Sequence, residues 1–359
     1  MGGFLLAMLS GGRVVQAVIV EVDRQVAISP IGEYRSQYSP WVMHESGWGS
    51  HVMFYCRNTN ENGKMADRVW RAENWKDGVK GDWGGEMIVI DGTLGELDDL
   101  SCSPGVVIGT DSKWHMYYVT AERNKSCDLY LYHAVASSPG VNWEKKGAIR
   151  IEGINWPVTN CGMETPSPFL VDGKIRIYVP YQTGKLLVAD SSDGHIFGNT
   201  KIIDLPDKTS GIGRVMLKNN LMYYVYGKNI NNNPYEPTNQ IWITGSRNGG
   251  LSFVASKKLF EVSGLAWSPQ LLWNENGVEK VYYAEVDNLP RTAERWFGDN
   301  TSIGVRSFEG IESMFVEGDY DGDGVVNLAD FGEWKKRYLA TPPTMTLVEF
   351  GVWKRGYLK

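Results

Sequence analysis

The chain has 359 residues and a formal net charge of −6, and it is rich in tryptophan, tyrosine and glycine, with 14 Trp, 18 Tyr and 41 Gly. A chain of this length accommodates one large domain and one small domain. The negative charge argues against nucleic acid or an anionic membrane as the main partner. No apolar run approaches the roughly 20 residues that a membrane-spanning helix needs.

The first 17 residues form a separate segment with some features of a secretory signal peptide. They contain a short apolar stretch, Phe4–Leu9, and a small residue, Ala17, at a position suited to cleavage. Arg13 follows the apolar stretch instead of preceding it, so the basic segment typical of signal peptides is missing. A remnant of a signal peptide and an ordinary chain terminus both stay open.

A pair of short strands joined by a tight turn recurs along the chain, as in Pro168–Val171 followed by Ile175–Tyr181. A Gly-Ile-Gly-Arg unit at 211–214 fills the longest gap between copies. The other four of the five copies begin at Ser-Pro pairs, and the Ser-Pro residues are Ser39, Ser103, Ser167 (the copy just given) and Ser268. Proline is tolerated there because it lies at the start of a strand. Five diverged copies predict an all-β, five-bladed β-propeller over residues 18–315.

The fifth copy is one strand short, because only three strand-like segments follow Val262. Val18–Ile28, near the other end of the chain, is rich in β-branched residues. We expect it to add the fourth strand of blade five. Closing the ring in this way removes the exposed edges that an open array would leave.

Four cysteines, Cys56, Cys102, Cys127 and Cys161, allow three pairings that the sequence does not distinguish. Their spacing matches no zinc-site pattern. We expect buried thiols, with one or two disulfides as the alternative.

One end of the predicted ring gathers the ends of the second strands and the loops that join successive blades. These segments carry carboxylates, cations and aromatic side chains. Sugar rings stack on aromatic faces while their hydroxyls bind charged groups, so this composition predicts a carbohydrate pocket. The expected ligand contacts are Tyr38, Ser39, Ser103, Trp156, Tyr181, Arg214, Trp267 and Glu285.

Glu164-Thr165-Pro166 resembles the Glu-Gly-Pro or Glu-Cys-Pro motif of the five-bladed glycoside hydrolases of family 43, to which family 32 is more distantly related. The distance from Pro166 to the turn glycine Gly173 also fits that motif. The resemblance covers about residues 18–315. It implies a glycoside hydrolase acting on poly- or oligosaccharide, with Glu164 as the general acid on blade three.

The chain departs from that family on blades one and two. In the family the inner strands of both blades begin with Asp-Pro, and these aspartates act as general base and as pKa modulator. Ser39 and Ser103 stand there in this chain, and a serine hydroxyl without an adjacent histidine cannot act as the base at neutral pH.

Hydrolysis needs a second carboxylate across the scissile bond from the acid. The sequence offers Asp98, Asp99, Glu122 and Glu33 as candidates. We expect Asp98 or Asp99 to be the neighbour of Glu164. The alternatives are a propeller that binds glycans without cleaving them and a structural attachment protein.

Residues 316–359 contain an Asp-rich loop with oxygen ligands at positions 1, 3, 5, 9 and 12 and glycine at position 6. This is the spacing of a calcium loop, in which residue 7 adds a backbone carbonyl. The expected Ca²⁺ ligands are Asp319, Asp321, Asp323, Val325, Asn327 and Asp330. The loop and the helix after it resemble a type I dockerin repeat. The resemblance implies an extracellular or cell-surface protein and a cohesin-like or intramolecular partner for the module.

The segments 328–339 and 347–358 lie nineteen residues apart and are identical at seven of twelve positions. The second copy is preceded by no acidic ligands, so it predicts a helix without a second calcium loop. We expect two short helices that pack their aromatic residues together, namely Phe331, Trp334, Tyr338, Phe350, Trp353 and Tyr357.

Calorimetry on the whole protein should therefore detect one equivalent of Ca²⁺. Chelation should loosen residues 317–359 and leave the propeller folded, because the ion organises only its own helical pair. Binding of two equivalents, or of none, contradicts this expectation.

Overall fold

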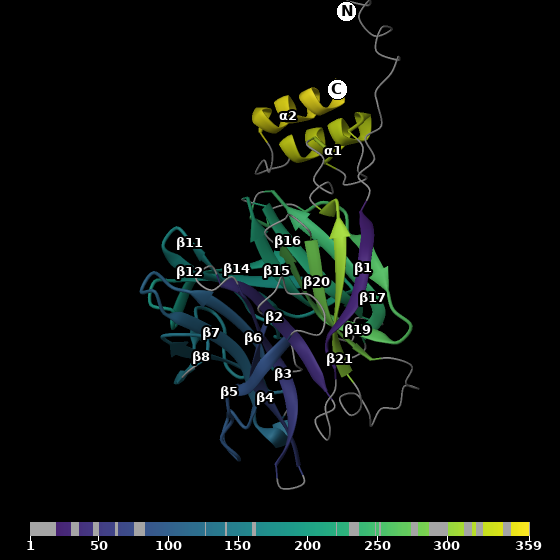
Figure 1. The fold of residues 1–359 in the computed structure, drawn as a ribbon. Helices are drawn as coiled ribbons and strands as arrows, with labels where there is room; N and C mark the ends of the chain where they lie inside the picture. The colour runs from purple at the N-terminus through teal and green to yellow at the C-terminus, as the bar shows by residue number, and fades with distance from the viewer. Residues whose placement is uncertain are drawn as a thin grey trace, which may run out of the picture.

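In the computed structural model the chain forms five small sheets arranged as a ring, with two short helices lying together outside it (Figure 1). The structure describes residues 19–29, 36–45, 50–61, 64–74, 83–125, 127–140, 142–159, 163–219, 221–229, 237–247, 249–250, 253–273, 279–286, 301–311, 318–320, 326–339 and 346–358. The segment 1–17 lies outside these residues. No helix among them is long and apolar enough to cross a membrane.

The blades follow one another in chain order, and within each blade successive strands pair antiparallel. Blade one consists of β2 (Gln37–Glu45), β3 (Ser50–Glu61), β4 (Lys64–Asn74) and β5 (Trp83–Ile90). Blade two consists of β6 (Leu100–Ile108), β7 (Trp114–Ala121), β8 (Tyr130–Ala136) and β9 (Glu144–Ala148), with the short 3₁₀ helix η1 (Arg123–Lys125) after β7.

Blade three gains a fifth strand, because β10 pairs parallel with β14. Its strands are β11 (Ser167–Val171), β12 (Lys174–Pro180), β13 (Lys185–Ser191), β14 (Ile196–Asp204) and β10 (Arg150–Ile151). Blade four consists of β15 (Ser210–Lys218), β16 (Leu221–Asn229), β17 (Pro237–Ser246) and β18 (Lys257–Glu261). Blade five consists of β19 (Leu265–Trp273), β20 (Glu279–Val286), β21 (Thr301–Glu309) and β1 (Val20–Ile28).

Strand β1 closes the ring, as the sequence predicts. It runs antiparallel to β21, from the pair Val20↔Glu309 to the pair Ile28↔Ile303. An ion pair between Arg306 Nη1 and Glu21 Oε2, at 2.7 Å, ties the same two strands through their side chains. The first strand in the sequence thus becomes the outer strand of the last blade.

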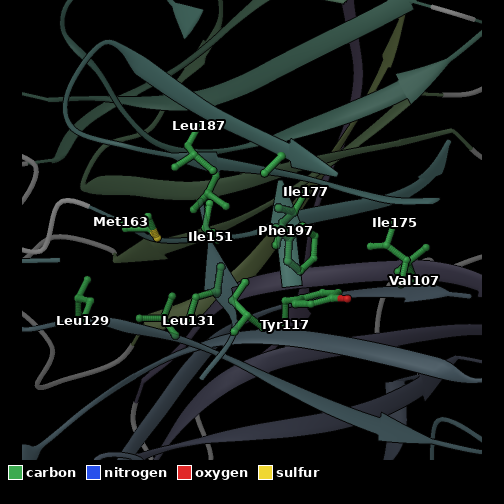
Figure 2. Packing of buried hydrophobic residues seen from close by; sticks show 14 of the residues in the cluster. Val107, Tyr117, Leu129, Leu131, Ile151, Met163, Ile175, Ile177, Leu187 and Phe197 are labelled. Carbon is green, nitrogen blue, oxygen red and sulfur yellow. The ribbon is translucent and has the colours of Figure 1, made fainter. Parts of the chain in front are cut away.

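The hydrophobic core is divided into one main cluster at each interface between neighbouring blades. Figure 2 shows the cluster between blades two and three, where Tyr117 and Leu131 face Ile177 and Phe197. Middle strands are covered on both faces, and every residue of β7 is buried. This is why the second strands of the repeats are continuously aromatic and apolar and do not alternate with polar residues.

The inner strands of four blades carry a residue in the left-handed backbone region directly before a proline. These residues are Ser39, Ser103, Thr165 and Ser268, with φ of 51°, 52°, 48° and 48°. In β2, β6 and β19 the strand register shifts at this point, as at a β-bulge, which re-aims the side chain. On blade three the equivalent position is therefore Thr165, and the alignment of Ser167 with the other Ser-Pro pairs is wrong.

The two helices, α1 (Leu328–Tyr338) and α2 (Leu347–Tyr357), pack as the sequence repeat predicts. Phe331 lies 5.0 Å from Trp353, and Phe350 lies 4.8 Å from Trp334, measured between ring centroids. Trp334 Nε1 donates to the carbonyl of Thr346 at 3.0 Å, and Trp353 Nε1 donates to the carbonyl of Asn327 at 2.8 Å. Asn327 and Thr346 are equivalent positions of the nineteen-residue repeat, and so are Trp334 and Trp353. The two hydrogen bonds are therefore related by a local twofold symmetry.

Removal of residues 1–28 should unfold the propeller, because it deletes β1 and exposes the edge of β21. A melting temperature measured by circular dichroism gives the test. A truncation of residues 1–18, which keeps β1 whole, is the matched control. A soluble, folded 1–28 truncation with an unchanged melting temperature shows that closure by β1 is dispensable.

Candidate functional site

Hydrogen bonds near the axis connect the inner strands of all five blades, and we name this set of contacts the axial ring. Ser103 Oγ donates to Ser39 Oγ at 3.3 Å, and Ser39 Oγ donates to Ser268 Oγ at 3.2 Å. Thr165 Oγ1 donates to the carbonyl of Gly213 at 2.8 Å. These bonds link blade two to blade one, blade one to blade five, and blade three to blade four.

Arg214 completes the axial ring from blade four. Its Nη1 donates to the carbonyl of Pro166 at 2.8 Å, and its Nη2 donates to the carbonyl of Ser39 at 3.2 Å. Its guanidinium also lies over the ring of Trp41, 5.1 Å from the centroid. Burial lowers the pKa of Arg214 to about 9, so the side chain is still protonated at neutral pH.

The axial ring changes the interpretation of three predicted ligand contacts. Arg214 is fully buried, Ser39 is 1% exposed and Ser103 is 4% exposed. Their polar atoms bind one another and backbone carbonyls of neighbouring blades. In this structure they hold the blades together and do not face solvent, so they are poorly placed for direct contact with a ligand.

Glu164 precedes Thr165, the blade-three member of the axial ring, and its side chain is half-buried. Burial first, and the charge of Asp67 second, raise the pKa of Glu164 to about 7. No donor among the described residues forms a hydrogen bond with this carboxyl that would hold it ionised. The carboxyl of Glu164 therefore keeps its proton to a higher pH than an ordinary glutamate does, and its role as general acid stays a prediction.

Asp67 is the carboxylate whose charge acts on Glu164, and the sequence reasoning missed it. It lies on β4 opposite Asn58 of β3, and Asn58 Nδ2 donates to Asp67 Oδ1. The hydroxyl of Tyr38 forms a second hydrogen bond with Asp67. The pKa of Asp67 is raised overall, because burial outweighs the opposing effects of the hydrogen bond with Tyr38, the charge of Arg68 and the hydrogen bond from Asn58.

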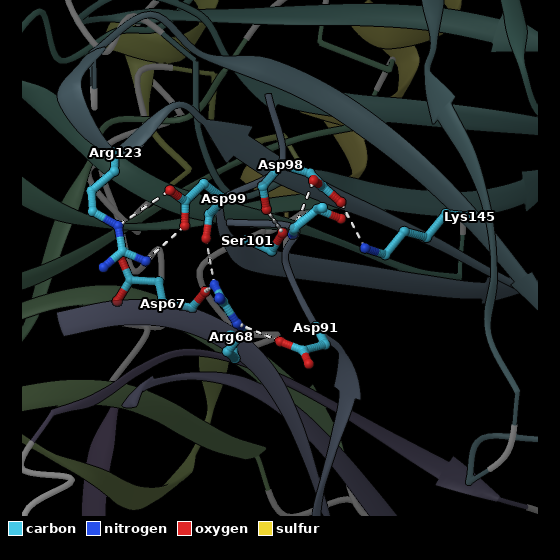
Figure 3. Close-up of polar contacts among 9 residues, drawn as sticks. Asp67, Arg68, Asp91, Asp98, Asp99, Ser101, Arg123 and Lys145 are labelled. Carbon is cyan, nitrogen blue, oxygen red and sulfur yellow. Dashed lines mark hydrogen bonds and ion pairs between the residues drawn. The ribbon is translucent and has the colours of Figure 1, made fainter. Parts of the chain in front are cut away.

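Asp98 and Asp99 do not provide the charge that acts on Glu164, so the expectation that either is its neighbour is wrong. Figure 3 shows Lys145 on Asp98 and Arg123 on Asp99. Lys145 Nζ lies 2.6 Å from Asp98 Oδ2. Arg123 binds Asp99 through two nitrogens, at 2.7 and 3.2 Å. Both carboxylates stabilise the loop before β6, and a catalytic role for either stays a prediction.

Burial acts to raise the pKa of Asp99, but the hydrogen bonds from Arg123 and from the Gly95 N–H outweigh it and lower the pKa below the usual value. Asp98 Oδ1 accepts the backbone N–H of Thr93 at 3.1 Å. These contacts are typical of a loop held in one conformation by buried carboxylates.

The other predicted residues divide between solvent and core. Glu122 is partly exposed and pairs with Lys125 at 3.2 Å. Glu285 is 1% exposed and pairs with Arg24 at 3.1 Å, and Trp267 is buried. Trp156 and Tyr181 are half-buried. Of the aromatic residues proposed to contact a ligand, Trp156 and Tyr181 keep part of their surface exposed. Glu33, a candidate second carboxylate, lies outside the described residues.

A disulfide joins Cys56 of β3 to Cys102 of β6, so the expectation of buried thiols is wrong for this pair. It links blades one and two next to Ser103, whose backbone N–H lies 2.8 Å from Cys56 Sγ. Cys127 is disulfide-bonded as well, to a residue outside the described part of the chain. The Cys56–Cys102 bond is possible because the ring brings strands of two neighbouring blades together.

The described part of the predicted calcium loop shows two side chains that cap α1. Asp330 Oδ2 accepts the N–H of Asn327 at 2.7 Å, and Asn327 Oδ1 accepts the N–H of Ala329 at 2.6 Å, which together form a capping box. Asp330 Oδ1 accepts the N–H of Tyr320, and Asp319 is buried. The remaining predicted ligands, Asp321, Asp323 and Val325, lie outside the described residues. Among the residues that are described, no group of three or more His, Cys, Asp or Glu side chains could hold a metal ion.

A second group of titratable side chains lies between blades two and three, away from Glu164. His115 Nδ1 lies 3.0 Å from His133 Nε2, and His115 Nε2 lies 3.1 Å from Asp111 Oδ1. The ring of His133 stacks on Tyr117 with 4.9 Å between centroids. Burial first, then the neighbouring His115 and His195 and more weakly Lys146, lower the pKa of His133 to about 3, against the charge of Asp193.

No protein-family model and no curated protein matches the chain. Solved structures do match it over most of its length. A glycosyl hydrolase from Bacteroides ovatus has a TM-score of 0.56 at 14% identity, with 80% of this chain and 94% of that chain covered. The catalytic domain of a family 62 α-L-arabinofuranosidase from Coprinopsis cinerea has a TM-score of 0.57 at 10% identity, with 80% and 97% covered. An α-L-arabinofuranosidase from Lactobacillus brevis has a TM-score of 0.58 at 9% identity, with 79% and 93% covered. Identities this low establish likeness of fold.

Acid should destabilise the propeller through His133. Folding lowers the pKa of His133, so the neutral imidazole stabilises the folded state fully above the unfolded pKa of about 6.5. Below that pH the unfolded state takes up a proton that the folded state does not, and the free energy of unfolding falls by about 1.4 kcal/mol for each pH unit. Denaturant unfolding at pH 7 and pH 5 should show a loss of about 2 kcal/mol from this group. His133→Phe, which keeps the stack on Tyr117, should reduce the loss, and an equal loss in both proteins contradicts the assignment.

Proposed function

We propose that this chain is a glycoside hydrolase in which Glu164 is the general acid. The observation that carries the proposal is the pKa of Glu164, raised to about 7 beside a second carboxylate, Asp67. A general acid must hold its proton while substrate is bound, and a carboxyl with this pKa does so near neutrality. The likeness of fold to hydrolases named above supports the same class of chemistry.

Arabinose- and xylose-containing poly- or oligosaccharides are the first substrates to test. Two of the structures named above are α-L-arabinofuranosidases, and a third match is a β-xylosidase. The half-buried rings of Trp156 and Tyr181 offer apolar faces on which a sugar ring can stack.

A glycan-binding propeller without activity is the second candidate, and the axial ring is the observation that favours it. Serine hydroxyls engaged with one another occupy the positions of Ser39 and Ser103, where the resembled family has carboxylates. If no carboxylate replaces them, Glu164 binds a sugar hydroxyl and cleaves nothing. A purely structural attachment role requires neither the raised pKa of Glu164 nor its contact with a sugar hydroxyl.

We also propose an extracellular location and a calcium site. The disulfide Cys56–Cys102 supports an oxidising compartment. The predicted Ca²⁺ ligands are all oxygen donors, which suit this hard ion. A cohesin-like or intramolecular partner for the helical module rests on the resemblance to dockerin repeats.

Glu164→Gln should abolish hydrolysis of unactivated glycosides, with kcat/KM lower by about 10²–10⁴-fold, and should spare much of the activity on aryl glycosides with good leaving groups. In the parent protein kcat/KM should fall as pH rises through about 7, because the acid loses its proton there.

Glu144→Gln is the matched control, since Glu144 is an exposed residue of β9 that pairs with Lys146. A parent protein that turns over no glycoside, together with a Glu164→Gln variant that binds glycans as the parent does, favours the binding propeller. Full activity of Glu164→Gln on natural linkages refutes the acid assignment.

A further inference from the structure

A hydrolase built on this ring needs a second carboxylate, and the positions at the starts of the inner strands do not offer one. Ser39, Ser103 and Ser268 are buried, and their hydroxyls bind one another within the axial ring. The nearest predicted replacements, Asp98 and Asp99, are held by Lys145 and Arg123.

We propose that Asp67, on the third strand of blade one, is the second carboxylate of the site and acts as the base that takes a proton from the attacking water. This inference rests on the hydrolase function proposed above. It moves the base from the inner strand of blade one to a strand further from the axis. It also assigns a role to a residue that no sequence motif marks.

The placement of Asp67 follows from the strand pairing of blade one. Asp67 pairs with Asn58 across β3 and β4, and Tyr38 pairs with Cys56 across β2 and β3. Tyr38 lies on β2, the innermost strand of the blade, and its hydroxyl forms a hydrogen bond with Asp67 across β3. Arg214 donates to the carbonyls of Ser39 and Pro166, so it links the segment that carries Tyr38 to the segment that carries Glu164. The charge of Glu164 accordingly acts on Tyr38.

The donors around each carboxyl decide which one carries the proton. Asp67 accepts hydrogen bonds from Tyr38 and Asn58, and the cations Arg68 and Arg123 act on it. Each of these contacts favours the ionised form. Glu164 has no such donor among the described residues and experiences the charge of Asp67. These contacts offset part of the rise that burial causes in the pKa of Asp67, and nothing among the described residues offsets it at Glu164, so a proton shared by the two carboxyls is expected on Glu164.

This distribution suits hydrolysis in one step. The Asp67 carboxylate removes a proton from water as the water oxygen bonds to the anomeric carbon. The bond from that carbon to the leaving oxygen breaks, and the leaving oxygen takes the proton of Glu164. Asp67 ends protonated and Glu164 ends ionised, and proton exchange with solvent restores the starting state.

The first test measures the pair without any substrate. The pKa of Glu164 can be followed by ¹³C NMR of carboxyl-labelled protein, with Glu164→Gln used to assign the signal. In Asp67→Asn the Glu164 pKa should fall toward its usual value, because the neighbouring negative charge is gone. Asp204→Asn is the matched control, since Asp204 forms an exposed pair with Lys208 on blade three and should leave the Glu164 pKa unchanged. An unchanged Glu164 pKa in Asp67→Asn overturns the pairing.

The second test measures the base. On an aryl glycoside whose leaving group needs no acid, Asp67→Asn should lose about 10²–10⁴-fold in kcat/KM. Formate or azide should restore part of the rate of Asp67→Ala, while neither anion should rescue Glu164→Gln on that substrate. Undiminished activity of Asp67→Asn overturns the base role while the hydrolase proposal stands. Absence of activity in the parent protein on all glycosides overturns the hydrolase proposal and the base role together, and leaves the NMR result to decide the pairing.

Tyr38→Phe keeps the inference testable if Asp67→Asn fails to fold. This variant retains the buried ring and removes one donor to Asp67, so the pKa of Asp67 should rise. The acidic limb of the pH profile of kcat/KM should then move to higher pH, with a smaller loss at its maximum than in Asp67→Asn. An acidic limb that stays in place contradicts the role of Asp67.

Discussion

The axial ring is the constraint on which the arrangement of the blades depends. The inner strands of five sheets meet at the axis, where an unpaired buried donor or carbonyl costs about 1–3 kcal/mol. Arg214 reduces this cost, because its Nη1 and Nη2 donate to carbonyls of two other blades. The serine hydroxyls and Thr165 complete the set.

The same constraint determines where acidic chemistry can lie. Ser39 and Ser103 contribute hydroxyls that bind one another, so the starts of these inner strands carry no carboxylate. The carboxyl groups that remain for acidic chemistry are Glu164, next to the axial ring, and Asp67 on the third strand of blade one, and only Asp67 has side-chain donors among the described residues. The difference in donors between two neighbouring carboxyls is what separates an acid from a base at such a site.

The helical module shows how a sequence repeat becomes a symmetric structure. The two nineteen-residue copies place a tryptophan and a capping residue at equal spacing, and each tryptophan donates to the capping carbonyl of the other helix. α2 has the capping box of Thr346 and Glu349, and α1 has that of Asn327 and Asp330. Two short helices are thereby held by reciprocal contacts that neither could form alone.

The sequence alone determined the five blades, the closing strand and the helical pair, because strand patterns, turns and repeats are local properties. It also singled out Glu164 through one short motif. Only the tertiary structure decided that Arg214, Ser39 and Ser103 bind one another, that Cys56 bonds Cys102, and that Thr165, not Ser167, matches the other inner strands. Only the tertiary structure brought the charge of Asp67 to act on Glu164, because the two residues belong to different blades. Their relation depends on strand register and on a left-handed residue before proline, and no pattern of residue types records either feature.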